Sequence, residues 1–131
     1  MKTVVAIDPG QDKCGVAVVN DESVLHMSVI PRRHAAAAVV TLCARFSPQV
    51  IIIGNGTGSG FLADELEART EMPVELVDEA YSTRKARLRY FRENPPRGLR
   101  RLIPLGLLVP PQPYDDYVAL ILAEEWLKQD E

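Results

Sequence analysis

The stretch from Thr3 to Val19, "TVVAIDPGQDKCGVAVV", constrains the fold most, because two β-branched apolar runs flank a sharp turn. Such runs predict two buried strands, over residues 2–7 and 14–20. A single carboxylate, Asp8, stands where the first strand enters the Asp-Pro-Gly turn. A charge at this place is either an ordinary turn residue or part of a site that opens at the tip of the strand.

The rest of the chain alternates between helical and extended patterns. Further strands are predicted at residues 23–29, 49–54 and 73–79, and helices at residues 32–46, 61–70, 82–93 and 114–128. The run "QVIIIG" is short, continuous and apolar, which is typical of a central parallel strand. Ser82 is a candidate cap for the third helix. The pattern predicts one α/β domain over residues 1–131, with a mixed sheet covered by helices.

Composition excludes several classes of protein. The chain has 131 residues, of which 47% are hydrophobic and 25% charged, the balance of a soluble globular domain. No secretory signal is recognisable, and no apolar run approaches the roughly 20 residues that span a bilayer. Cys14 and Cys43 lie in apolar segments without metal-type spacing, so we expect buried reduced thiols. We therefore expect a cytoplasmic protein without a membrane partner.

Charge is distributed unevenly. The whole chain carries −3, but residues 84–101 hold eight basic residues and one acid, a local charge of +7 that leaves −10 for the remainder. The basic segment is either a solvated helix face with a packed connector or a surface that holds phosphates, since arginine forks suit phosphate. We favour phosphate binding, and the candidate nucleic-acid contacts are Arg84, Lys85, Arg87, Arg97, Arg100 and Arg101.

Acidic residues recur where the predicted elements meet. Asp8 ends the first strand, Asp78-Glu79 end the fifth, and Asp115-Asp116 begin the last helix. Each alone also has an explanation as a turn or cap residue. Together, at the carboxyl ends of strands, they predict a site for Mg²⁺ or Mn²⁺, because converging carboxylates repel unless a cation is present. Helical spacing leaves the choice between Asp115 and Asp116 open, since both flank the dry face of the helix.

A glycine-rich loop, "GNGTGSG", follows the predicted central strand. It lacks the Lys-Ser/Thr ending of a P-loop and has no GxGxxG, so nucleotide binding is poorly supported. We expect instead a backbone-lined loop beside the metal site that tolerates close approach of a nucleic-acid strand. The residues predicted near the site are Gly10, Asn55, Gly56, Thr57, Ser82 and Thr83.

Three motifs resemble a known family. "AIDPGQDKCGVAVV" resembles the first-strand motif of the RuvC-like branch of the RNase H superfamily, with Asp8, Gly10 and Gly15 at the matching positions. "VELVDEAYSTRKAR" is similar to the YqgF (RuvX) motif that places a glutamate at Glu79, and "DDYVALILAEEWL" to its C-terminal helix motif, whose register selects Asp115. "IIIGNGTGSG" resembles the loop in the YqgF-type domain of the transcription accessory protein Tex.

The resemblance implies an RNase H-like fold, a five-stranded mixed sheet of order 3-2-1-4-5 with strand 2 antiparallel, flanked by helices. It implies that Asp8, Glu79 and Asp115 act in catalysis and, with Asp116 assisting, hold two Mg²⁺ or Mn²⁺ ions. The implied activity is hydrolysis of phosphodiester bonds in structured nucleic acid, of the Holliday-junction resolvase or pre-rRNA processing type.

Two alternatives stay open. A domain of this kind can keep the fold and bind nucleic acid without turnover, as a Tex-like domain would. Half of an actin-like ATPase also opens with an aspartate and glycines, but its phosphate machinery needs two such domains.

The sequence does not separate branched DNA from structured RNA as the partner, and it leaves the oligomeric state open. A resolvase that makes paired cuts would be a symmetric homodimer, for which the apolar "LIPLGLLVPP" is the candidate interface.

Overall fold

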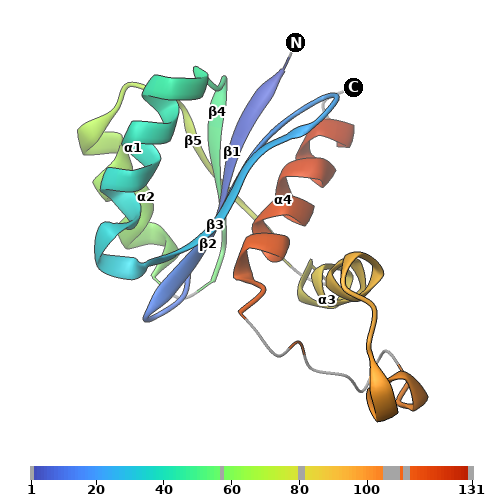
Figure 1. Cartoon of the computed structure of the whole chain (residues 1–131). Helices are drawn as coiled ribbons and strands as arrows, with labels where there is room; N and C mark the ends of the chain where they lie inside the picture. The colour runs from blue at the N-terminus through green and yellow to red at the C-terminus, as the bar shows by residue number, and fades with distance from the viewer. Residues whose placement is uncertain (1, 57, 80–81, 105–109, 111–112, 130–131) are drawn as a thin grey trace.

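A five-stranded mixed sheet in the order β3-β2-β1-β4-β5 lies at the centre of the computed structural model (Figure 1), which describes residues 2–56, 58–79, 82–104, 110 and 113–129. The strands are β1 (Thr3–Asp8), β2 (Lys13–Asn20), β3 (Val24–Pro31), β4 (Val50–Gly54) and β5 (Val74–Val77). β2 is antiparallel to β1 and β3, whereas β4 is parallel to β1 and to β5. The expected sheet order and the antiparallel second strand are confirmed.

Helices cover both faces of the sheet. They are η1 (Arg32–His34), α1 (Ala35–Phe46), α2 (Ser59–Arg69), α3 (Ser82–Glu93), η2 (Gly98–Leu102) and α4 (Asp115–Gln129). In Figure 1, α1 and α2 lie on one face and α4 on the other, and α3 lies beside α4. Within the described ranges, no helix is long and apolar enough to span a bilayer.

The sheet separates two hydrophobic cores. Along β1, Val5 and Ile7 pack with α1 and α2, whereas Val4 and Ala6 pack with α4. This alternation follows from the two-residue period of a strand. Because Asp8 continues the series of Val4 and Ala6, its side chain belongs to the α4 face. β4 is buried along its whole length, as expected of a central parallel strand covered on both faces.

The first predicted helix begins differently from the prediction but ends as predicted. Its first turn is the separate 3₁₀ helix η1, and α1 follows it. α1 ends at Phe46 because Ser47 adopts the left-handed conformation, with φ of 49°, and donates its N–H to the carbonyl oxygen of Cys43 at 2.9 Å. Pro48, which follows, cannot continue the helix. Cys43 is a buried free thiol, and so is Cys14, as predicted.

One further helix start and one predicted cap differ from the prediction. α2 begins at Ser59, two residues early, directly after Gly58 in the left-handed conformation with φ of 71°. The expectation that Ser82 caps α3 is wrong. Ser82 is the first residue of the helix, and its hydroxyl is buried without a hydrogen-bond partner among the described residues. The position therefore depends on burial of a small side chain rather than on capping.

Candidate functional site

Asp8 lies at the carboxyl end of β1, between two neighbouring strands that each have a glycine beside it. In the antiparallel pair of β1 and β2, Asp8 is opposite Gly15. On the other side, Ile7 is paired with Ile53 of β4, so Gly54 follows at the level of Asp8. Neither neighbour carries a side chain, and the space this leaves beside Asp8 is taken by the Glu79 carboxylate over Gly54 and by the backbone of Asp115 over Gly15.

The carboxylate of Glu79 occupies a slot formed by Gly54 and Gly56, which we call the glycine slot. A Cβ on Gly54 would overlap one carboxylate oxygen, Oε2, and a Cβ on Gly56 would lie 2.7 Å from the other, Oε1. Asn55 accepts a hydrogen bond from the Glu79 N–H at 3.3 Å and donates its own N–H to Val77 at 2.9 Å. The bare backbone of β4 thus lets Glu79, which follows β5, reach across to Asp8 on β1.

The start of α4 presses directly on β2. A Cβ on Gly15 would overlap the carbonyl oxygen of Asp115 and lie 2.5 Å from the backbone nitrogen of Asp116. Only glycine permits this approach, which brings the first turn of α4 beside Asp8. Gly15, the second glycine of the first-strand motif, is therefore the point at which β2 contacts the start of α4. That helix supplies the third acidic residue of the site.

The electrostatics of Asp8 show that the carboxylates share one field. Its pKa is raised from 3.8 to about 8, first by burial, then by the negative charges of Glu79 and Asp115 and by a hydrogen bond with Glu79. Burial also raises the pKa of Asp116, and the Tyr117 N–H opposes this effect by donating to Asp116 Oδ1 at 3.0 Å. Asp115, rather than Asp116, is the helix carboxylate whose charge acts on Asp8.

The chemistry of these groups fits a divalent cation, but their side chains are not yet arranged as a complete set of ligands. One Glu79 oxygen, Oε2, is buried without a hydrogen-bond partner among the described residues, and the field at Asp8 favours added positive charge. All donors are hard carboxylate oxygens of the kind that Mg²⁺ and Mn²⁺ prefer. However, across the described ranges no three acidic, histidine or cysteine side chains already form a group that could hold one ion. Side-chain adjustment would have to accompany metal binding.

The predicted loop residues have different roles. Gly10 closes the turn after β1, because a Cβ there would lie 2.5 Å from the carbonyl oxygen of Lys13. Asn55 and Gly56 contact Glu79, so the glycines of this loop already serve an internal carboxylate. Contact with a nucleic-acid strand stays a prediction. Thr83 is exposed on α3, and Thr57 lies outside the described residues.

The basic segment is divided between internal and outward-facing residues. Lys85 forms an ion pair with Glu125 of α4, so its charge is partly neutralised within the protein. Arg89 is held by Glu124 and by Glu93, each at 2.8 Å. Of the six predicted nucleic-acid contacts, four are exposed, Arg84, Lys85, Arg97 and Arg101, and two are half-buried, Arg87 and Arg100. Positive charge thus faces outward at the start of α3 and around η2.

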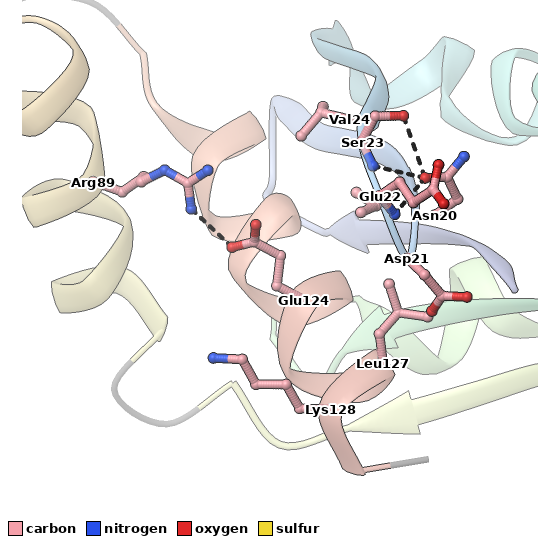
Figure 2. A pocket seen from close by; sticks show the side chains of 10 residues that line it. Asn20, Asp21, Glu22, Ser23, Val24, Arg89, Glu124, Leu127 and Lys128 are labelled. Atoms are coloured by element: carbon pink, nitrogen blue, oxygen red, sulfur yellow. Dashed lines mark hydrogen bonds and ion pairs between the residues drawn. The ribbon is translucent and has the colours of Figure 1, made fainter. Parts of the chain in front are cut away.

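A large hollow lies elsewhere. Its volume is about 600 Å³, and it opens between the β2–β3 turn and the C-terminal half of α4 (Figure 2). Arg89, Glu124 and Lys128 line it on the helical side. On the turn side, the Asn20 side chain accepts hydrogen bonds from the backbone of Glu22 and Ser23. None of the predicted site residues lines this hollow, so size alone does not identify the functional site.

Two residues at the site were missed as site residues in the sequence. Gly54 is the last residue of the buried run "VIIIG", and a glycine there signals that something must fit over the strand end. Gly15 was recognised as a motif position, but its contact with α4 depends on the tertiary fold. The alternation of Val4, Ala6 and Asp8 was a further signal, because it assigns Asp8 to one face of the sheet.

Comparison with known proteins gives a family and a fold. Residues 2–102 match the model of the RuvX family, described as Holliday junction resolvase. The matched range includes Asp8 and Glu79 and ends before Asp115. No curated protein gives a significant match.

Two solved structures of RuvC from Thermus thermophilus are similar in fold. One covers 98% of this chain and 96% of its own, with 18% identity and a TM-score of 0.66. The other, in complex with a Holliday junction substrate, covers 94% and 90%, with 19% identity and a TM-score of 0.58. This likeness confirms the expected RNase H-like fold.

Proposed function

Because the chain belongs to the RuvX family of Holliday junction resolvases, we propose that it is a metal-dependent nuclease that hydrolyses phosphodiester bonds in branched DNA. The observation that carries the proposal is the meeting of Glu79 and Asp8 across the glycine slot, with the start of α4 held against Gly15. Three elements distant in sequence deliver carboxylates to one end of the sheet. Bringing partly buried carboxylates together costs free energy, so the arrangement is expected only where these groups have a function.

Asp8, Glu79 and Asp115 would hold the cations. When bound, divalent cations supply positive charge that stabilises the attacking and leaving oxygens of a phosphodiester. The glycine slot holds the carboxylate of Glu79, and the Asn55 side chain holds its backbone by accepting the Glu79 N–H. Asp8 holds a proton near neutral pH in the metal-free protein and releases it to become a ligand. Asp116 assists by accepting the Tyr117 N–H, which orders the first turn of α4.

The outward-facing arginines would hold the nucleic-acid backbone. Arg84, Arg97 and Arg101 are exposed, and their guanidinium groups match phosphate in geometry and charge. Lys85 contributes less, because Glu125 already pairs with it. Since phosphate contacts position a substrate without reading bases, this surface supports binding to the shape of a branch rather than to a sequence.

The proposal is tested by cleavage. The purified protein is incubated with Mn²⁺ or Mg²⁺ and an immobile four-way junction, linear duplex DNA, double-stranded RNA or single strands. We expect metal-dependent cuts in the junction and none by the Asp8→Asn variant, which keeps the shape of the side chain. Equal cleavage by wild type and variant would refute the assignment of Asp8, and cleavage confined to RNA would move the substrate to RNA processing.

A second candidate function is binding without turnover. It is favoured by the finding that, in the part of the chain described, the acidic side chains do not already form a three-ligand group. In the same assay, tight junction binding with no cleavage in either metal would support this alternative.

A further inference from the structure

A small hollow opens at the C-terminal end of α3, about 240 Å³ in volume. It is lined by two rings, two prolines, two arginines and an asparagine: Tyr90, Phe91, Pro95, Pro96, Arg97, Arg100 and Asn94. The lining thus combines apolar rings and prolines with two cationic side chains. It is separate from the carboxylate cluster and from the larger hollow between the β2–β3 turn and α4.

The wall of this hollow is held in place by its own contacts. The Tyr90 ring meets Phe91 edge-on, with 5.3 Å between ring centroids, and meets Tyr117 of α4 in the same manner at 5.5 Å. Phe91 is buried. Asn94 donates a hydrogen bond from its side chain to the Tyr90 carbonyl oxygen at 3.1 Å. The rings are therefore positioned before any ligand arrives, which lowers the entropic cost of binding.

Chemistry selects the kind of occupant. Rings and prolines in the lining accept a flat ligand by stacking, and arginines in the same lining attract phosphate. The surrounding segment, residues 84–101, carries +7, and its one acid, Glu93, is already paired with Arg89. An unpaired nucleobase with its flanking phosphates meets both requirements. An apolar peptide would use the rings but would not satisfy the two arginines of the lining.

The position of the hollow relates it to the carboxylates. Tyr117, whose ring touches Tyr90, lies two residues after Asp115, a helical rise of about 3 Å. Adding the 5.5 Å between the rings and the reach of the side chains places the hollow on the order of 10–15 Å from the acidic site. At about 3.4 Å per nucleotide of a stacked strand, this corresponds to about three to four nucleotides.

We propose that this hollow is a subsite for one unpaired base of branched DNA, about three to four nucleotides from the phosphate held at Asp8, Glu79 and Asp115. The inference rests on the proposed function, because it takes DNA at the acidic site as given. It also explains why the protein would prefer branched DNA to a continuous duplex. A junction offers a base that can leave its stack cheaply, whereas a continuous duplex must first be unpaired.

Binding of a fluorescent base tests the subsite without cleavage. 2-Aminopurine, whose fluorescence falls on stacking, is placed unpaired at successive positions from the branch point, and wild-type protein is added in chelator. We expect quenching at one position within the predicted register and loss of that quenching in Tyr90→Leu. Phe61→Leu is the matched control, because Phe61 is an exposed ring of α2, 81% accessible. Quenching at every position, or unchanged quenching in Tyr90→Leu, would overturn the proposal.

An abasic site provides a measurement that does not depend on the variant folding. Replacing the captured nucleotide with an abasic site should weaken binding roughly 5- to 100-fold, the range expected for one stacked base. Unchanged affinity would overturn the subsite, as would a base-dependent loss seen in RNA but not in DNA. Junction cleavage by wild type with Mn²⁺ is measured in parallel. If cleavage occurs while the abasic site has no effect, the subsite fails and the proposed nuclease function stands.

Discussion

Replacing Asp8 with asparagine should stabilise the metal-free protein at high pH. Burial and the charges of Glu79 and Asp115 raise the pKa of Asp8 from 3.8 to about 8. Between these pH values the folded protein holds a proton that the unfolded chain releases, so stability falls as pH rises. This contribution is fully present below about pH 4 and is lost by about pH 8. The asparagine side chain of the Asp8→Asn variant has the same shape and nothing to ionise.

The magnitude follows from the pKa difference. About four pKa units at about 1.36 kcal/mol each give an upper bound of about 6 kcal/mol. Asp8 is only partly buried, so solvent screening reduces this to about 3 kcal/mol. In a domain of this size, 1 kcal/mol shifts the melting temperature by about 3–6 °C. The variant should therefore melt about 9–18 °C above wild type at pH 8 and close to it near pH 4.

Thermal melts in chelator from pH 4 to 9, followed by circular dichroism, measure the effect. The difference between variant and wild type removes the contribution of titrating groups that do not interact with Asp8. Asp64→Asn, at an exposed aspartate of α2 away from the acidic site, is the matched control. Millimolar Mn²⁺ should nearly cancel the difference at pH 8, because only wild type gains stability from the ion, about 2.7 kcal/mol at 100 times Kd.

A variant that is less stable than wild type at pH 8 in chelator would refute the reasoning. So would a difference curve that does not change with pH. Either result would mean that Asp8 does not share a field with the other two carboxylates, and the proposed metal site would lose its main support.

Three further changes test the glycines and the arginines. Gly54→Ala should reduce the Mn²⁺-induced shift in melting temperature, because its Cβ overlaps the carboxylate of Glu79; Gly60→Ala, with nothing within 4 Å, should leave the shift intact. Gly15→Ala should destabilise the fold by several kcal/mol, visible as loss of the cooperative melt, because its Cβ overlaps the backbone of α4. Removing Arg97 and Arg101 together should flatten the log–log salt dependence of DNA binding by about 0.7–0.9 per lost phosphate contact, whereas an unchanged slope would exclude them as contacts.

The order of the elements was predictable because each carries a local signal. The apolar run of β4 and the β-branched runs of β1 and β2 identify strands by composition alone. Their ends were less predictable. Ser82 carries the sequence signature of a cap, yet it is buried under packing against the rest of the protein, because tertiary contacts outweigh a local preference that is worth about 1 kcal/mol.

The internal use of basic residues was not predictable from the sequence. Lys85 and Arg89 belong to a segment whose charge pattern favours phosphate binding, but both pair with glutamates of α4 some 35 to 40 residues away. Such pairs depend on the packing of α3 on α4, which no local pattern encodes. What the pattern did identify, a positively charged surface, remains at Arg84, Arg97 and Arg101.

The spacing of the first-strand motif has a physical cause in this fold. Asp8 and Gly15 are seven residues apart because that is the separation of directly opposed residues across the turn between β1 and β2. The residue opposite Asp8 must be bare, since α4 starts there, and Gly54 on the other side must be bare, since Glu79 crosses it. A carboxylate with glycines on both flanks therefore has room for two further carboxylates. A charged residue such as Asp8 is unusual on a core strand. The two flanking glycines make the space in which the other carboxylates can approach it.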